Sequence, residues 1–194
     1  MEPLEVLKVV ISTLESLDIP SMLVGSFASS SHGLPRFTQD ADLVVRLGRN
    51  QIDGVIQAFS QEFYLDRGLI EQALINRSSF NIIHLASSFK VYFFVLCPGG
   101  YMEEEFSRRV LRQIDPRIEF AAYVQTAEDT LLSKLHWYRE GGEVSESQWR
   151  DVIGILKVQE GRLDLDYLQK WAQELGITDL LLRARQPVTK QLNT

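Results

Sequence analysis

The stretch MLVGSFASSSHGLPRFTQDADLVVR, residues 22–46, decides how the rest of the chain is interpreted. It holds two aliphatic runs separated by a Gly-Ser turn, a small-residue segment and a loop, and such runs bounded by turn residues are typical of β-strands. The second run begins Asp40-Ala41-Asp42. Because residues i and i+2 of a strand project to the same face, we expect the two carboxylates to lie side by side. Two like charges on one face favour a cation between them, and Mg²⁺ binds carboxylate and phosphate oxygens.

The Gly25-Ser26 turn supplies the opposite chemistry at the other end of this stretch. We predict a short helix over residues 26–31, and the exposed N–H groups at a helix start bind phosphate. Glycine there allows a phosphate to approach the backbone closely. A metal-bound nucleoside triphosphate would bridge the anion site at Gly25 and Ser26 and the cation site at Asp40 and Asp42.

Two residues of the intervening loop are further candidates. Arg36 suits bidentate phosphate binding, and simple pairing with the two carboxylates is the equally weighted alternative. Thr38 is a candidate nucleotide contact, or it only caps the turn. The acidic pair by itself is weak evidence, because 26 acidic residues in 194 make such pairs common. Only this pair opens an aliphatic strand and follows a Gly-Ser turn.

Residues 24–28 (VGSFA), 32–38 (HGLPRFT) and 40–44 (DADLV) together resemble the nucleotidyltransferase superfamily. Their spacing is similar to the AbiEii-type branch, known as toxins of abortive-infection systems, and to its bacterial relatives. The resemblance implies an α/β (α+β) fold, with a mixed sheet flanked by helices and with Mg²⁺ and an NTP held at one edge. It implies nucleotidyl transfer to an acceptor that is an RNA end, a protein hydroxyl or a small molecule. It also implies a toxin–antitoxin context with a partner antitoxin.

The resemblance implies two lysines as further site residues, and at one position the chain departs from the family pattern. Lys90 matches the lysine of the family pattern K-V-D-L-F, so we expect it at the nucleotide. The third carboxylate of that pattern is replaced by Tyr92. Phenols, with an ordinary pKa of about 10, are poor bases at neutral pH. His84, on the preceding predicted strand, is a possible substitute, with a packed histidine as the favoured alternative.

Lys134 matches the lysine of the family's E-[DE]-x-x-x-x-K-L helix, which points at the nucleotide, and a surface lysine is the alternative. Asp151 lies in a partial match to a second helical motif, and we expect it either to orient a basic side chain such as Lys134 or to form a structural ion pair. The expected catalytic residues are therefore Asp40, Asp42 and Lys134, with Asp40 and Asp42 also as metal ligands.

Tyr92 keeps a second class of function open. In it the chain is a catalytically silent member that binds nucleotide and works as a regulator or scaffold. A third reading is an acidic protein-binding module in which Asp40 and Asp42 only form salt bridges.

Composition limits these readings. The formal net charge of −6 and pI of about 5.1 argue against a broad nucleic-acid surface but leave room for a local basic pocket. No run of eighteen apolar residues is present and Cys97 is the single cysteine, so we expect no membrane span, no internal disulfide and a cytoplasmic protein.

We expect one compact unit, with residues 1–125 as the nucleotidyltransferase-like core and residues 126–194 as a helical region packed on it. Predicted helices cover residues 3–18, 26–31, 50–60, 69–77, 101–108, 126–140, 146–158, 164–175 and 178–185. Predicted strands cover residues 21–24, 40–45, 63–65, 79–85, 89–96, 110–114 and 118–124.

Overall fold

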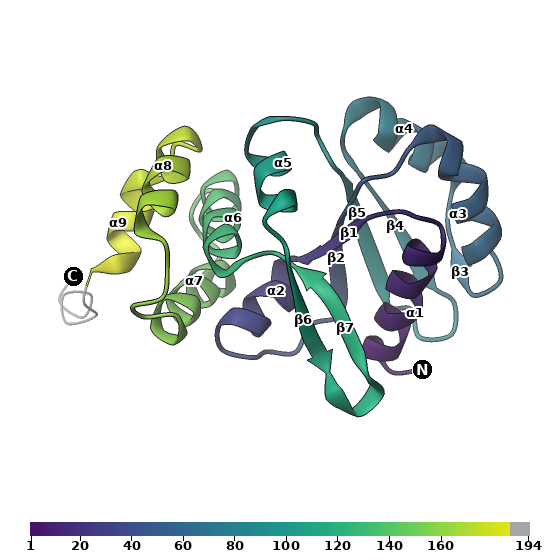
Figure 1. The fold of residues 1–194 in the computed structure, drawn as a ribbon, viewed down its shortest axis with the longest axis horizontal. Helices are drawn as coiled ribbons and strands as arrows, with labels where there is room; N and C mark the ends of the chain where they lie inside the picture. The colour runs from purple at the N-terminus through teal and green to yellow at the C-terminus, as the bar shows by residue number, and fades with distance from the viewer. Residues whose placement is uncertain (187–194) are drawn as a thin grey trace. The chain divides into compact units, whose positions relative to one another are not determined.

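The computed structural model describes residues 1–186 (Figure 1). The chain divides into two compact units. The first comprises Met1–Ala28 and Arg36–Gln125, and the second comprises Ser29–Pro35 and the chain from Thr126 onward. The polar tail after residue 186, which belongs to the predicted helical region, lies outside the described residues. The assignment of separate roles to residues 1–125 and 126–194 stays a prediction.

The first unit is built on a seven-stranded mixed sheet with strand order β3-β4-β5-β2-β1-β7-β6. Strand β2 lies in the middle, antiparallel to β1 and parallel to β5. This arrangement confirms the predicted fold class. The strands are β1 (Ser21–Val24), β2 (Asp40–Val45), β3 (Phe63–Tyr64), β4 (Ser79–His84), β5 (Lys90–Val95), β6 (Val110–Asp115) and β7 (Phe120–Val124).

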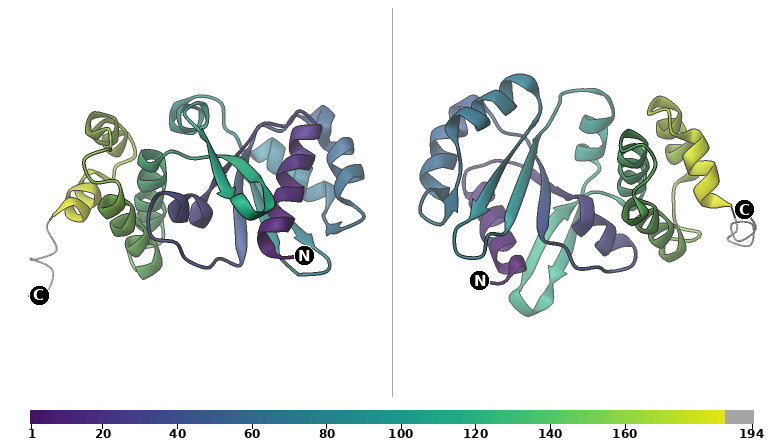
Figure 2. Two further views of the ribbon diagram at one scale, coloured as in Figure 1. Left: turned by 60° about the horizontal axis from the view of Figure 1, so that its bottom comes forward. Right: turned by 180° about the vertical axis from the view of Figure 1, so that it is seen from behind.

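One face of the sheet carries the main hydrophobic core. Helices α1 (Pro3–Ser16), α3 (Ile52–Phe59) and α4 (Arg67–Asn76) contribute to the same core cluster as this face. Figures 1 and 2 show these helices on one side of the strands. The strands contribute every second residue, among them Leu23, Leu43, Phe80, Val91 and Phe93. Burial of this alternating apolar set fixes the strand register, because a one-residue slip would turn it toward solvent.

The opposite face of the sheet has an apolar half and a polar half. Helix α5 (Gly100–Ser107) packs Phe106 and Met102 on Met22 and Val44, forming a small second core. Farther along the same face of β2, Asp42 and Asp40 carry carboxylates in place of aliphatic side chains. The polar half of this face therefore carries the chemistry that the sequence singled out.

The second unit is helical. It contains α6 (Ala127–Glu140), α7 (Glu146–Val158), α8 (Leu165–Glu174) and α9 (Thr178–Arg185), together with the second half of α2 (Gly25–His32). Gly33 packs tightly on α7, because a Cβ there would lie 3.0 Å from the backbone nitrogen of Ile155. The helix starts follow the sequence pattern: Thr126, Ser145 and Asp164 each accept a hydrogen bond from the backbone N–H three residues later.

Several boundaries differ from the predictions by one or two residues, and three of them have a clear local cause. Helix α1 ends at Ser16, and Asp18 adopts a positive φ of 53° in the turn that follows. The helix predicted from residue 50 begins at Ile52, because Arg49–Gln51 forms a 3₁₀ turn that precedes α3. Strand β7 begins at Phe120 because Pro116–Ile118 forms another 3₁₀ turn. Short-range hydrogen bonds decide such ends, and apolar periodicity does not report them.

Among residues 1–186, no helix combines the length and the apolar character needed to cross a bilayer.

The pair Arg139–Asp179 gives the second unit a pH-dependent contact. Arg139 donates to both carboxylate oxygens of Asp179, at 2.8 and 2.7 Å. These hydrogen bonds lower the pKa of Asp179 below its usual value. A carboxylate with a lower pKa in the folded than in the unfolded chain stabilises the fold above its unfolded pKa, and the contribution disappears as the pH falls through the folded pKa.

We therefore predict that Asp179→Asn lowers the melting temperature slightly near neutral pH, since exposed ion pairs contribute little. The difference from wild type should shrink as the pH falls below the ordinary aspartate pKa of about 3.9 and vanish once the wild-type carboxylate is also protonated. Thermal melts across this pH range measure it, with Asp166→Asn, another exposed carboxylate, as the matched control. A difference that persists unchanged into acid would contradict the assignment.

Candidate active site

Asp40 and Asp42 lie on the same face of β2. Both are half-buried, whereas Ala41 between them is buried in the core on the opposite face. In the parallel ladder to β5, Asp40 pairs with Lys90 and Asp42 pairs with Tyr92. Directly paired residues project to the same side of a sheet, so two carboxylates, an ammonium and a phenol share this face.

Gly25 brings the turn before α2 against Asp42. Its φ of 62° lies in the left-handed region, which glycine adopts without the cost that a side chain adds. A Cβ built on Gly25 would lie 2.1 Å from Oδ2 of Asp42, so only glycine leaves room for the carboxylate. The start of helix α2 and the Asp42 carboxylate are therefore in close contact.

The loop before β2 adds two contacts to this group. Arg36 donates from Nη2 to Oγ of Ser26, which places its guanidinium at the first turn of α2. Thr38 donates from Oγ1 toward Oδ1 and the carbonyl oxygen of Asp40, both at 3.1 Å. Thr38 thus restrains the orientation of the Asp40 carboxylate, and its contact with a nucleotide stays a prediction.

Two pockets flank Phe37, whose side chain is 77% exposed. One, of about 400 Å³, is lined by Asp40, Lys90 and Tyr92 together with Phe37. The other, of about 580 Å³, is lined by Arg36 and Thr38 together with Phe27 and Phe37. Concave space therefore lies beside Asp40 and beside Phe27 in the first turn of α2.

Strand β4 carries two residues that bear on the site. Asn81 was not predicted, and His84 was considered as a substitute for the missing carboxylate. Asn81 pairs with Tyr92 and is half-buried, so its amide extends the polar row formed by Asp42 and Tyr92. The alternation of Ser79, Asn81 and Ile83 against buried neighbours is the signal that could have identified it. His84 has the opposite parity and is buried, with its Nδ1 2.7 Å from Oγ of Ser87. His84 is therefore a packed histidine and does not replace the missing carboxylate.

Lys134 lies in the second unit, in a buried ion pair. Its Nζ is 2.9 Å from Oδ2 of Asp151, and both side chains are about 95% buried, with exposed fractions of 6% and 5%. Ser29 donates to the same oxygen at 3.1 Å. The structure thus groups the other predicted site residues in the first unit and shows Lys134 bound to Asp151. A contact between Lys134 and a nucleotide stays a prediction.

The donor set fits Mg²⁺ that arrives with a nucleotide. Within the described chain, no three His, Cys, Asp or Glu side chains gather into a cluster that could hold a metal by itself. Mg²⁺ does not need such a cluster, because it is commonly bound by one or two carboxylates together with water and substrate phosphates. Asp40 and Asp42 meet that requirement, and Lys90 lies where it can offset phosphate charge.

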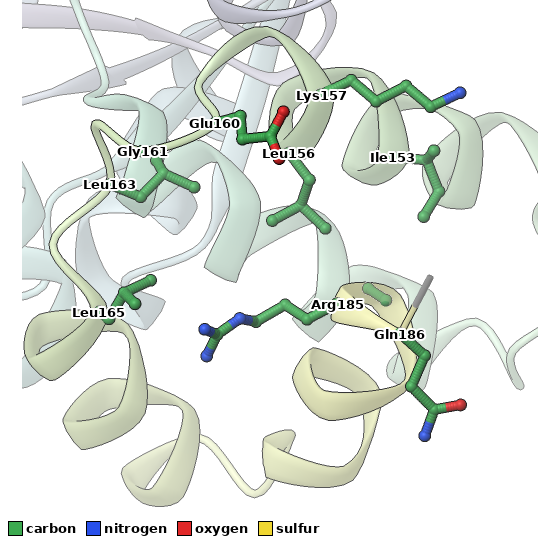
Figure 3. Close-up of a pocket in the computed structure, with 10 residues that line it drawn as sticks. Ile153, Leu156, Lys157, Glu160, Gly161, Leu163, Leu165, Arg185 and Gln186 are labelled. Atoms are coloured by element: carbon green, nitrogen blue, oxygen red, sulfur yellow. The ribbon is translucent and has the colours of Figure 1, made fainter. Parts of the chain in front are cut away.

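A further pocket, of about 500 Å³, lies in the second unit among α7, α8 and α9 (Figure 3). Leu156, Leu163 and Leu165 line it, and Arg185 extends toward its middle while Lys157 points away. Its lining contains no pair of carboxylates comparable to Asp40 and Asp42. We therefore assign the candidate site to the first unit.

We predict that Gly25→Ala destabilises the protein by roughly 2–5 kcal/mol, from backbone strain plus the clash with Asp42. Gly100→Ala is the matched control, because Gly100 has the same φ of 62° but nothing within 4 Å of an added Cβ. It should cost only the strain, about 1–2 kcal/mol. Urea unfolding of both variants measures the difference. Equal losses would show that Asp42 moves aside freely.

We also predict that Lys134→Met or Asp151→Leu alone lowers the free energy of unfolding by about 3–5 kcal/mol, since each leaves a buried charge without its partner. The double variant Lys134→Met/Asp151→Leu should regain most of this loss. Urea unfolding of the three variants tests the coupling. Losses that simply add in the double variant would contradict it.

The chain matches no protein-family model and no curated protein sequence. Solved structures share its fold. The antigenic nucleotidyltransferase-like protein from Paracoccidioides brasiliensis has a TM-score of 0.54 at 16% identity, over 100% of this chain and 97% of that one. The antibiotic-resistance factor ANT(2'')-Ia has a TM-score of 0.52 at 8% identity, over 93% and 90%. The lincosamide antibiotic adenylyltransferase LnuA, with lincomycin bound, has a TM-score of 0.50 at 11% identity, over 77% and 93%. At these identities the likeness shows a nucleotidyltransferase-like fold.

Proposed function

We propose that this protein is an Mg²⁺-dependent nucleotidyltransferase that moves a nucleotidyl group from an NTP to an acceptor. The observation that carries the proposal is the contact between the Asp42 carboxylate and the Gly25 turn at the start of α2. It joins a candidate cation site to a candidate phosphate site within one face of one unit. Two of the structures that share the fold are described as a nucleotidyltransferase-like protein and an adenylyltransferase, which supports this class of reaction.

Asp40 and Asp42 hold the metal in this proposal. Mg²⁺ bound there supplies charge neutralisation and polarises the phosphate that is attacked. The backbone N–H groups after Gly25 and the Ser26 hydroxyl receive phosphate oxygens. Arg36, already at Ser26, adds a planar guanidinium to the same phosphates.

Three further residues assist. Lys90, beside Asp40 in the ladder, balances charge on the departing pyrophosphate. Thr38 keeps the Asp40 carboxylate turned toward the metal through its hydroxyl bond. Lys134 contacts a phosphate, with Asp151 fixing the direction of its ammonium. The part of this scheme that involves Lys134 rests on the motif resemblance alone.

The acceptor is an RNA end, a protein hydroxyl or a small molecule. LnuA is described as a lincosamide adenylyltransferase, which supports the small-molecule class. The AbiEii-type relationship, a partner antitoxin and a cytoplasmic location stay predictions from the sequence.

Tyr92 favours one alternative function. It occupies the ladder position beside Asp42 where the family pattern has a third carboxylate. A protein with this substitution and only two carboxylates would bind Mg²⁺ and nucleotide without turnover. In that case it acts as a nucleotide-dependent regulator or scaffold.

We predict that Mg²⁺ with the preferred NTP stabilises the wild-type protein against heat. Binding to the native state at about 100 times Kd contributes about 2.7 kcal/mol. For a chain of this size that raises the melting temperature by roughly 5–10 °C. Asp40→Asn/Asp42→Asn should abolish the Mg²⁺-dependent part of the shift. Scanning fluorimetry with each NTP, with and without Mg²⁺, measures it.

Glu104→Gln/Asp166→Asn is the matched control, because it removes two acidic charges from exposed positions outside the site. It should keep the full shift. A shift that survives in the Asp40→Asn/Asp42→Asn variant, or no shift with any NTP, would overturn the proposed site. A shift without transfer to any acceptor would favour the silent alternative.

A further inference from the structure

Tyr92 lies beside the proposed metal ligands, where its hydroxyl could take part in the reaction. It is half-buried on β5, in register with Asp42 of β2, and lines the pocket that also holds Asp40 and Lys90. Among the described residues, its hydroxyl makes no hydrogen bond. The phenol lies in the same row as the two carboxylates, and its hydroxyl is not committed to another described residue.

The length of the side chain sets what the hydroxyl can reach. Asp42 and Tyr92 leave neighbouring parallel strands at the same level, about 4.8 Å apart. A tyrosine extends farther from the sheet than an aspartate. Its hydroxyl can therefore reach farther from the sheet than the carboxylate of Asp42, to where the phosphates of an NTP would lie if Asp40 and Asp42 held its Mg²⁺. A carboxylate in this position would sit lower, beside the metal.

We propose that the Tyr92 hydroxyl is itself a nucleotidyl acceptor, so that the protein modifies its own site. This inference rests on the proposed function, because it needs the bound Mg²⁺–NTP. The phenol oxygen attacks the α-phosphorus, a Tyr92 O–P bond forms, and the bond from that phosphorus to the bridging oxygen of the β-phosphate breaks. Pyrophosphate leaves with the electron pair of the broken bond, and the phenol proton passes to water.

The neighbouring residues suit this reaction. Lys90, two residues before Tyr92 on the same face, offsets charge that develops on the phosphates. Ser87 and Ser88 line the same pocket and are the competing hydroxyls. Ser87 is engaged, since its Oγ lies 2.7 Å from Nδ1 of His84 and accepts a hydrogen bond from the backbone N–H of Phe89. Tyr92 combines a hydroxyl without a bond and the ladder position next to Asp42.

The test is intact-mass spectrometry of the full chain after incubation with Mg²⁺ and each of ATP, GTP, CTP and UTP. We expect a mass increase of one nucleotidyl group, with an equal amount of pyrophosphate released. The tryptic peptide that follows Lys90 and ends at Arg108 contains both Tyr92 and Tyr101. Fragmentation between these two tyrosines assigns the adduct in the wild-type protein without relying on a variant.

Tyr92→Phe should reduce the labelled fraction to background, as should Asp42→Asn. Tyr64→Phe is the matched control, because Tyr64 is an exposed tyrosine on another strand of the sheet, and it should label like wild type. Ligand-free melting temperatures of all variants show whether each is folded.

The melting-temperature shift of the wild-type protein with Mg²⁺ and NTP separates the two hypotheses. A shift without an adduct overturns this inference and leaves the proposed function standing. An adduct on Ser87, Ser88 or Tyr101 also overturns it. No shift and no adduct overturn both. An adduct on Tyr92 that requires Mg²⁺ and Asp42 establishes it.

Discussion

The contact between the Asp42 carboxylate and the backbone of Gly25 is the constraint on which the site depends. Strand β1 ends at Val24, which pairs with Asp42 in the antiparallel ladder. The chain must then turn into helix α2 within one residue, directly over that carboxylate. A residue with a Cβ does this only at a cost, both because of the positive φ and because the Asp42 carboxylate fills the space. The register of two strands, the start of a helix and the position of an acid are thus fixed together.

The register of the sheet also determines which residues of β5 lie beside Asp40 and Asp42. The apolar face of β2 and β5 packs on α1, α3 and α4, and burial of that face sets the register that pairs Asp40 with Lys90. The polar side chains on the other face need no packing of their own to be aligned. Their alignment follows from the packing of the core beneath them, and the hydroxyl of Thr38 further restrains the Asp40 carboxylate.

Much of this was predictable from the sequence, for identifiable reasons. The run from Asp40 to Val45 alternates and is bounded by a loop, so both the strand and the shared face of the acids follow from period two. Asn81 was missed because an amide in an apolar strand has no motif. Its alternation with apolar neighbours indicates the polar face, but only the ladder places it beside Tyr92. The role of His84 was ambiguous because the sequence does not show which face of β4 packs on the core, and His84 lies on the buried face.

The contacts of Lys134 and Ser29 with Asp151 could not be predicted from local sequence patterns. Ser29 and Asp151 are 122 positions apart in the chain, and no local pattern pairs them. The packing of Gly33 on α7, which places Ser29–Pro35 with the helices of the second unit, likewise depends on tertiary contact. Apolar periodicity identified the helices there, but long-range polar partners required the structure.

The two faces of β2 and β5 are subject to different demands. On one face, each side chain must fill a particular volume, so drift at Leu43 or Phe93 would be penalised by misfolding before any activity is lost. On the other face, Lys90 is exposed and Tyr92 is half-buried, so exchanges there should cost the fold less. Proteins with this fold can therefore change the residues of the polar face one at a time while the core keeps the fold. A tyrosine in place of an acid is the kind of change that such a surface permits.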